Sequence, residues 1–276
     1  MDTAVRKAPV VASTESVELD WAGRPVRVEY QWLRREDTQA PLMVFLHEGL
    51  GSVSMWRDFP AALCEALGCR GLVYSRPGYG LSTPRASGEQ WRPDFMHRQA
   101  REVLPALLSA LDIDPIQDRL WLLGHSDGGS IALLYAALFP DRLSGAIVLA
   151  PHILVEDVSI ESIAEARTAY LDTDLRQRLA RHHRDPDSAF WGWNDIWLHP
   201  DFRSWRIDQE LHTITCPLLA VQGVNDRYGT MEQVHGIARV APQCAVVELA
   251  DCGHSPHLEQ RDRLIEVVRN FYSSTH

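Results

Sequence analysis

The sequence predicts an α/β fold: a mostly parallel, doubly wound sheet of eight strands with a helical cap inserted after the sixth strand. Continuous apolar runs recur along the chain, and such runs are typical of parallel strands that helices cover on both faces. Segments with helical periodicity fall between them, so strand and helix alternate. The apolar runs are 42–46, 71–74, 120–123, 146–149, 218–221 and 245–249.

The first two strands have a different pattern. Residues 16–21 and 26–32 alternate apolar and polar side chains and are separated by Ala22-Gly23-Arg24-Pro25. Alternation around a tight turn predicts an antiparallel hairpin at one edge of the sheet. We expect helices at 56–67, 95–111, 129–138, 231–240 and 261–272, and a core domain made of residues 1–150 and 217–276.

The interval 151–216 interrupts the alternation. It has helical periodicity and no strand run, so it predicts a helical cap over the ends of the strands. Most of its aromatic side chains should pack the cap against the core. One or two should form an apolar roof over a cleft, and we take Trp193 and Trp197 as candidates for substrate contact. The dense aromatic cluster of this interval consists of Phe190, Trp191, Trp193, Trp197, Phe202 and Trp205.

Composition and charge exclude several classes of partner. The 276 residues carry a net charge of −10, which disfavours nucleic acid and anionic membranes as partners. The five cysteines are scattered without a C-x-x-C pair, which favours reduced thiols. Residues 1–14 lack an apolar leader, and no run approaches the ~18 apolar residues of a membrane span. We therefore expect a soluble, cytoplasmic protein with a small-molecule substrate; its oligomeric state stays open, a homodimer included.

The motif Gly124-His125-Ser126-Asp127-Gly128 stands between an apolar strand and an apolar helix. A strand that enters a helix through G-x-S-x-G forms a nucleophile elbow, a sharp turn that exposes the serine hydroxyl. Ser126 is therefore the predicted nucleophile.

A serine hydroxyl needs a histidine to take its proton and an acid to orient that histidine. Asp226 follows the seventh strand and His254 follows the last strand, at the sheet edge where open α/β sheets place their sites. Taken singly, Asp226 could cap a helix and His254 could be an ordinary loop histidine. Together with Ser126 they have the chain order of a Ser-Asp-His triad.

An acyl transfer also needs hydrogen-bond donors for the oxyanion. The N–H of Asp127 supplies one, and the loop His47-Glu48-Gly49-Leu50-Gly51-Ser52 supplies another. Gly49 is the expected donor in this loop, with Glu48 and Leu50 as alternatives. A phosphate cradle is disfavoured because the Gly-Lys-Ser/Thr of a P-loop is absent.

These motifs resemble the α/β-hydrolase superfamily over nearly the whole chain. His47-Glu48-Gly49 stands where such proteins usually have His-Gly-x, and residues 75–82 resemble their glycine-rich loop after the fourth strand. Residues 124–129 are similar to the elbow of valacyclovir-hydrolase-like members. The resemblance implies the α/β-hydrolase fold and a cofactor-independent serine hydrolase acting on an ester, thioester or activated amide. The same triad also serves lyases and perhydrolases, and the scaffold serves ligand-binding receptors.

Two carboxylates should lie near the nucleophile. In valacyclovir-type enzymes an aspartate beside the serine recognises an ammonium group; carried to Asp127, this implies a substrate with an amine or another donor. The alternative is that Asp127 accepts backbone hydrogen bonds where the helix begins. In either case Glu48 and Asp127 together should disfavour a substrate with a carboxylate near its scissile carbonyl.

The remaining candidates are less specific. His152 follows the sixth strand and is a candidate lining residue of the cleft, whereas His182 and His183 are expected on a solvated cap surface. Arg76 either binds a substrate anion or braces its own loop. No histidine pair stands in a metal-binding frame, so neither a metal nor a cofactor is expected.

Overall fold

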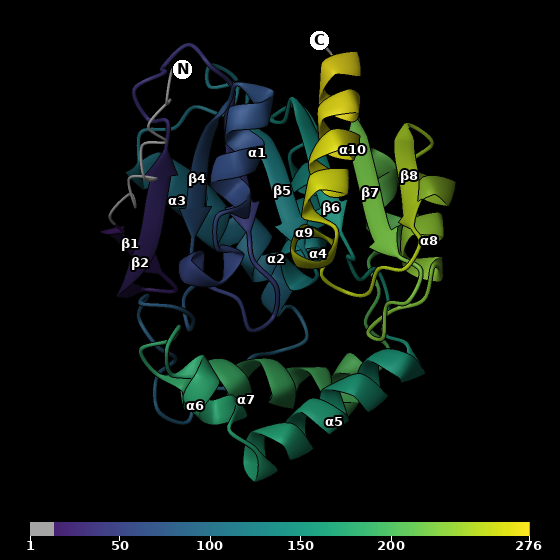
Figure 1. Ribbon diagram of the computed structural model, residues 1–276. Helices are drawn as coiled ribbons and strands as arrows, with labels where there is room; N and C mark the ends of the chain where they lie inside the picture. Colours follow the sequence, from purple (N-terminus) through teal and green to yellow (C-terminus); the bar gives the residue numbers. More distant parts are fainter. Residues whose placement is uncertain (1–13, 276) are drawn as a thin grey trace, which may run out of the picture.

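Eight strands form one sheet, in the order β1-β2-β4-β3-β5-β6-β7-β8, in this computed structural model, which describes residues 14–275 (Figure 1). β1 and β2 form the expected antiparallel hairpin, β2 also runs antiparallel to β4, and all other pairs are parallel. The predicted mostly parallel eight-stranded sheet is therefore confirmed. The strands are β1 Glu15–Trp21, β2 Arg24–Leu33, β3 Leu42–Leu46, β4 Arg70–Tyr74, β5 Trp121–His125, β6 Gly145–Leu149, β7 Leu218–Gly223 and β8 Cys244–Leu249.

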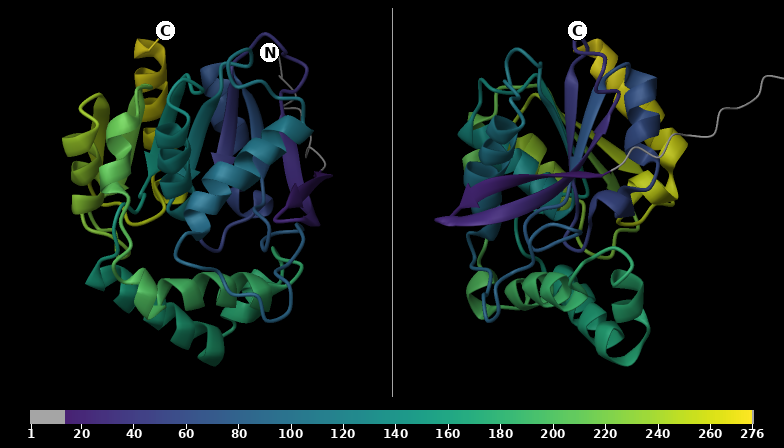
Figure 2. Two further views of the ribbon diagram at one scale, coloured as in Figure 1. Left: turned by 180° about the vertical axis from the view of Figure 1, so that it is seen from behind. Right: turned by 90° about the vertical axis from the view of Figure 1, so that its left-hand side faces the viewer.

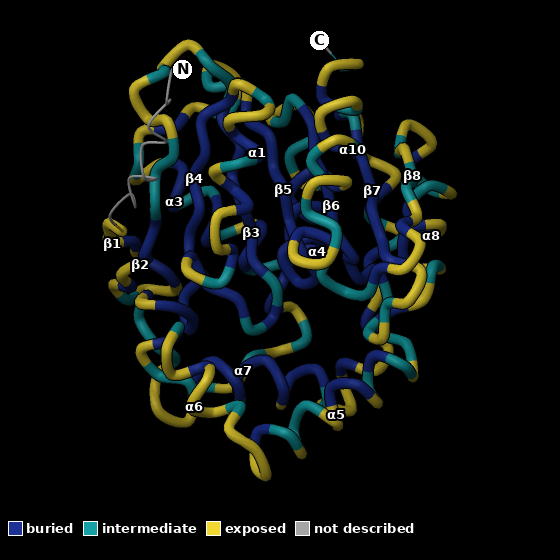
Figure 3. Tube along the Cα trace, in the orientation of Figure 1, coloured by how far each residue is buried: buried dark blue, intermediate teal, exposed yellow. Residues whose placement is uncertain are grey.

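Helices cover both faces of the sheet. α1 (Phe59–Leu67) and α10 (Arg261–Ser274) lie on one face, and α3 (Leu104–Ala110), α4 (Asp127–Leu138) and α8 (Glu232–Val240) lie on the other (Figure 2). Successive side chains of a strand enter the two cores in turn, as the period of two requires. The central strands are therefore buried throughout (Figure 3).

The edge strand β8 departs from the expectation for a strand buried on both faces. Of its six residues only Leu249 is buried, and the others are half-buried or exposed. β8 pairs with β7 alone, so one of its sides has no neighbouring strand. An apolar run does not distinguish such an edge from a central strand.

Two predicted helices are divided at prolines. The run expected at 95–111 consists of α2 (Phe95–Arg98), a π-helical turn η2 (Gln99–Val103) and α3, with Pro105 in the first turn of α3. Proline has no N–H to give to the preceding turn, and a π turn accommodates that loss. The helix expected to begin at Trp56 is instead a 3₁₀ turn, η1 (Val53–Trp56), followed by α1 with Pro60 in its first turn.

Residues 151–216, the inserted segment, connect β6 to β7. They form α5 (Asp157–Asp172), α6 (Leu175–Leu179), α7 (Pro186–Trp197) and the 3₁₀ turns η3 (Pro200–Phe202) and η4 (Asp208–Thr213). The Asp185 carboxylate accepts the Ser188 N–H and so caps α7. Figure 1 shows α5, α6 and α7 lying across the ends of the parallel strands.

His183 joins the inserted segment to two loops of the sheet. It is buried, its Nδ1 accepts the Gly80 N–H at 2.9 Å, and its Nε2–H donates to the Leu50 carbonyl at 2.9 Å. The expectation of a solvated surface histidine is therefore wrong for this residue. His183 is buried by contacts with Gly80 and Leu50, which lie more than 100 residues away in the chain, so its neighbours in the sequence do not reveal its burial.

The helix that follows the sheet's central strand crosses β3 at very short range. A Cβ added at Gly128 in α4 would lie 2.0 Å from the Leu46 carbonyl oxygen, and one added at Gly124 would lie 2.1 Å from the Gly128 carbonyl oxygen. Both contacts are to backbone, which cannot move aside. The glycines of the elbow motif are thus required by this crossing.

The expectations about cysteines, membrane spans and a leader segment can be compared only in part with the structure. Within residues 14–275 no cysteine forms a disulfide and no helix is long and apolar enough to cross a membrane. The leader argument concerns residues 1–14, of which all but Thr14 lie outside the described residues.

We expect Gly128→Ala to lower the free energy of unfolding by about 3 kcal/mol, because its methyl group would collide with the backbone of Leu46. Urea denaturation measures this. Gly229→Ala is the control, since its Cβ would meet side chains rather than backbone: Gln233 at 3.1 Å, His152 at 3.5 Å and Glu156 at 3.6 Å. Equal loss in the two variants would contradict the account.

We expect acid to loosen the attachment of the inserted segment through His183. Burial lowers the pKa of this imidazole to about 4, whereas in the unfolded chain it is near 6.5. Between these values the unfolded chain binds more protons, so stability falls as the pH falls. From pH 7.5 to pH 5, His183 alone should remove about 2 kcal/mol of the free energy of unfolding.

His183→Gln keeps one donor and one acceptor but does not titrate, so its pH dependence should be flatter than that of the wild type by that amount. His235→Gln, at an exposed position on α8, is the control. Parallel curves for wild type and His183→Gln in urea titrations would refute the role of His183.

Candidate active site

A cavity of about 200 Å³ lies between the strand ends and the inserted segment, and the predicted nucleophile and base both line it. The five residues predicted to contact substrate line the same cavity. Its walls are Glu48, Gly49, Leu50, His125, Ser126, Asp127, His152, Ile163, Trp193, Trp197, Tyr228, His254 and Ser255.

Ser126 occupies a strained turn between β5 and α4. Its φ of 52° and ψ of −120° are values that a residue with a side chain rarely adopts. The Ser126 N–H donates to the Leu149 carbonyl at 2.9 Å, which holds the turn against the neighbouring strand. The hydroxyl thus projects beyond the sheet edge at the N-terminus of α4.

His254 and Asp226 meet in a bidentate hydrogen bond. The Nδ1 of His254 lies 2.9 Å from both Oδ1 and Oδ2 of Asp226, so this nitrogen carries the proton and donates it to the carboxylate. Nε2 is left without a proton in the neutral ring. An imidazole held in this tautomer can accept a proton at Nε2.

The Asp226 carboxylate is held by further donors that the sequence analysis did not single out. The Tyr228 N–H donates to Oδ1 at 2.8 Å, and the Gln222 side-chain amide donates to Oδ2 at 3.3 Å. Burial alone would raise the pKa of Asp226, but hydrogen bonding and charge from His254 together with the Tyr228 N–H keep the pKa low. In the sequence, Tyr228 and Gln222 are marked as partners of Asp226 only by their distance along the chain, since both lie within four residues of it.

The predicted nucleophile and the predicted base are not hydrogen-bonded to each other in this structure. Within residues 14–275, no hydrogen bond joins the Ser126 hydroxyl to the His254 ring. Hydrogen bonds between a serine and its base often tighten only in the complex with substrate, so this geometry is compatible with the predicted roles.

Gly49 brings its backbone to the cavity wall directly beneath α7. A Cβ at this position would lie 2.2 Å from the indole Nε1 of Trp193. No backbone hydrogen bond within residues 14–275 uses the Gly49 N–H. The N–H of Asp127, at the first position of α4, likewise has no partner within its helix.

Asp127 directs its carboxylate toward neighbours in the protein. Oδ1 accepts the Trp197 indole N–H at 3.1 Å, and Oδ2 lies 3.7 Å from the Arg76 guanidinium. Burial raises the pKa of this carboxyl, and Arg76 and Trp197 oppose that shift. These partners differ from both expectations, a substrate ammonium and the backbone N–H groups of the helix.

Arg76 is buried against two loops, its own loop and the loop that follows β3. Its side chain is only 1 % exposed, its guanidinium donates to the Glu48 carbonyl at 2.7 Å, and it lies over the Tyr79 ring at 4.7 Å. Its burial and these contacts favour a bracing role for Arg76 over the binding of a substrate anion.

Glu48 places a carboxylate at the cavity wall, with its side chain 24 % exposed. Its Oε2 lies 3.6 Å from Nδ1 of His125, whose Nε2–H donates to the His254 carbonyl at 2.7 Å. Burial alone would raise the pKa of Glu48, but the His125 imidazole beside its carboxylate holds that pKa well below its usual range. Glu48 is therefore an anion at neutral pH.

The other histidines near the cavity are neutral. Burial lowers the pKa of His152 and of His257 to about 3. His152 stands edge-on to Trp197, with ring centroids 4.9 Å apart, and its Nδ1 has no hydrogen-bond partner. In the described part of the chain, no group of three His, Cys, Asp or Glu side chains is placed to hold a metal ion.

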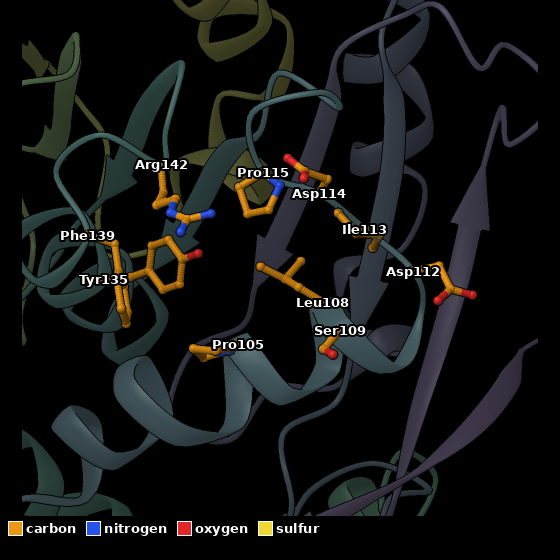
Figure 4. Close-up of a pocket in the computed structure, with 10 residues that line it drawn as sticks. All are labelled: Pro105, Leu108, Ser109, Asp112, Ile113, Asp114, Pro115, Tyr135, Phe139 and Arg142. Atoms are coloured by element: carbon orange, nitrogen blue, oxygen red, sulfur yellow. The ribbon is translucent and has the colours of Figure 1, made fainter.

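A larger cavity lies elsewhere and lacks comparable chemistry. It measures about 520 Å³ and is lined by α3, α4 and the loop after α3 (Figure 4). Figure 4 shows Tyr135 and Arg142 facing Leu108 and Pro115 across it. No histidine or cysteine lines this cavity, so its larger volume does not make it the better candidate for the active site.

Comparisons with known proteins agree with this architecture. The chain is 23 % identical over 279 residues to the sn-1-specific diacylglycerol lipase ABHD11 of Mus musculus, covering 90 % of this chain and 86 % of the lipase. It is also 23 % identical to the proline iminopeptidase of Saccharolobus solfataricus, covering 83 % and 84 % of the two chains. A thermophilic esterase from Thermogutta terrifontis superposes with a TM-score of 0.72 at 18 % identity, over 95 % of this chain and 99 % of the esterase.

The family model of the alpha/beta hydrolases matches residues 43–267, from β3 into α10. This range includes the elbow, both loops that carry Asp226 and His254, and the inserted segment. The chain belongs to the alpha/beta hydrolase family.

Proposed function

We propose that this protein is a cofactor-independent serine hydrolase that cleaves a carboxylic ester, thioester or activated amide through an acyl-enzyme on Ser126. One observation carries the proposal: His254 is bonded through Nδ1 to both oxygens of Asp226 and lines the same cavity as Ser126 on its strained turn. Proteins named as a lipase, an esterase and a peptidase are similar to this chain, so the proposal keeps both ester and amide bonds open.

In the first half-reaction the Ser126 oxygen attacks the scissile carbonyl carbon while Nε2 of His254 takes the hydroxyl proton. Asp226 stabilises the resulting imidazolium through its two hydrogen bonds with Nδ1. The carbonyl oxygen becomes an oxyanion, which the N–H groups of Gly49 and Asp127 hold. Nε2 then returns the proton to the leaving group as the carbonyl re-forms.

In the second half-reaction water replaces the leaving group. His254 removes a proton from the water, whose oxygen attacks the acyl carbon on Ser126. The tetrahedral intermediate uses the same N–H donors, and its collapse releases the carboxylic acid and returns the proton to Ser126.

The inserted segment acts in this proposal as a cap domain, residues 151–216, over a core of residues 1–150 and 217–276. Trp193 and Trp197 from α7 and Ile163 from α5 give the cavity an apolar roof. A volume of about 200 Å³ is small beside the roughly 300–1,000 Å³ of drug-sized sites. The best-fitting substrate has a small apolar or aromatic group next to the scissile bond.

An amine preference carried by Asp127, which the likeness to valacyclovir-type elbows implies, lacks support in the geometry. Trp197 already donates to Oδ1 of Asp127, and the Arg76 guanidinium, 3.7 Å from Oδ2, already balances the charge of this carboxylate. Glu48 is the carboxylate with an exposed face in the cavity, so charge selection by this site falls to Glu48.

We expect Ser126→Ala to reduce turnover by at least about 10⁴-fold, because no other hydroxyl stands on the elbow. The measurement is hydrolysis of p-nitrophenyl esters, acyl-CoA thioesters and amino-acid esters graded by acyl size. Ser109→Ala, at an exposed position on α3, is the control.

Turnover that survives in Ser126→Ala would overturn the serine mechanism. Wild type that turns over none of the panel, yet is labelled at Ser126 by a fluorophosphonate, would redirect the assignment toward a lyase, a perhydrolase or a receptor on the same scaffold.

We expect Glu48→Gln to relieve discrimination against anionic acyl groups. The ionised carboxylate repels a second carboxylate in a partly buried site, an effect of about tenfold or more in relative kcat/KM. The ratio of kcat/KM for p-nitrophenyl hemisuccinate to that for p-nitrophenyl butanoate should rise in the variant. An unchanged ratio would show that Glu48 does not select by charge. A ratio is used because Glu48 also belongs to the oxyanion loop, so its replacement can change the turnover of both esters together.

A further inference from the structure

Three donors converge on one backbone oxygen behind the oxyanion loop. The carbonyl of Glu48 accepts from the Arg76 guanidinium at 2.7 Å, from Nδ1–H of His47 at 2.7 Å and from the Gly51 N–H at 3.1 Å. His47 is held in this tautomer because its Nε2 accepts the Arg76 N–H at 3.0 Å. The orientation of the peptide group between residues 48 and 49 is thereby determined.

That peptide group also carries the N–H of Gly49. All peptide bonds in residues 14–275 are trans, and in a trans peptide the N–H points opposite to the C=O. With the Glu48 carbonyl directed at Arg76, the Gly49 N–H is directed away from the guanidinium, and Gly49 lines the cavity together with Ser126. A cationic donor on the carbonyl also polarises the amide and makes its N–H a stronger donor.

The same guanidinium faces the residue that would supply the second donor. It lies 3.7 Å from Oδ2 of Asp127, and both side chains are 1 % exposed. Trp197 holds the other carboxylate oxygen at 3.1 Å. Arg76 therefore stands between the loop after β3 and the first residue of α4, in contact with both.

We propose that Arg76 is a positioning residue of the oxyanion hole. It directs and polarises the Gly49 N–H through the Glu48 carbonyl, and it holds residue 127 through an ion pair, so that both N–H groups converge on one point near Ser126. This inference rests on the proposed serine hydrolase function. Arg76 does not touch the substrate.

The experiment compares Arg76→Met with Arg70→Met. Arg70 is also buried, lies on β4 and is paired with Asp118 at 2.5 Å, but at the strand end away from the cavity. Thermal unfolding and circular dichroism show whether the two variants are folded. The assays are p-nitrophenyl acetate hydrolysis and inhibition by an uncharged trifluoromethyl ketone, whose adduct with a serine carries an oxyanion.

For Arg76→Met we expect kcat to fall about 10²-fold with KM within about threefold, because the lost contact acts on the transition state. Affinity for the ketone should fall by a factor similar to the loss in kcat/KM. Arg70→Met should keep both values within about threefold. Arg76→Lys, which can supply one of the two contacts, should lie in between.

If Arg76→Met does not fold, Arg76→Met/Asp127→Asn replaces it, because this double variant leaves no unpaired buried charge and keeps both backbone N–H groups. Folded Arg76 variants with wild-type kcat and ketone affinity would overturn the positioning role. Ser126→Ala in the same assay separates the two claims. Hydrolysis that persists in Ser126→Ala overturns the proposed function, whereas hydrolysis lost there but kept in Arg76→Met overturns only the inference.

Discussion

The contact between Gly128 and the Leu46 carbonyl is the constraint on which the rest of the site depends. It lets α4 begin directly above the end of β3, so the turn between β5 and α4 must be made in a few residues. That turn places Ser126 at φ 52°, a conformation that only a well-supported backbone can hold. It also brings the first N–H of α4 beside the loop that follows β3, which is the requirement for an oxyanion hole formed by two separate segments.

The parts of this arrangement that follow from local pattern could be predicted from the sequence. The apolar runs, the elbow glycines and the order of Ser126, Asp226 and His254 are readable because each depends on neighbours in the chain or on the rule that strand ends share one edge. Arg76 and His183 could not be assigned in this way. The hydrogen-bond partners of these side chains lie 28 to 133 residues away in the chain. A single buried hydrogen bond of this kind produces no periodic pattern in the sequence. Sequence likewise could not show that β8 has an exposed side.

Burying the Arg76–Asp127 pair is costly, since both ions lose nearly all their contact with water. Replacing such a pair by apolar side chains often stabilises a protein, so its presence is better explained by what it orients than by stability. The neighbouring imidazole of His47, whose Nε2 accepts the Arg76 N–H, is kept neutral by burial. In the proposed mechanism the donors to the oxyanion thus lie beside a buried ion pair, Arg76 and Asp127, whose groups are held in place and do not have to reorganise when charge develops.

The inserted segment contacts each residue assigned to the oxyanion hole. Trp193 leaves no room for a side chain at Gly49, Trp197 donates to the Asp127 carboxylate, and His183 donates to the carbonyl of Leu50 in the same loop. Trp193 and Trp197 come from one helix, α7, and they also form the roof of the cavity. A substrate group that displaces α7 would therefore disturb the donors as well as the roof. In the proposed mechanism the side chains that contact the substrate also hold the oxyanion donors in place, so fit under the roof and stabilisation of the transition state are coupled.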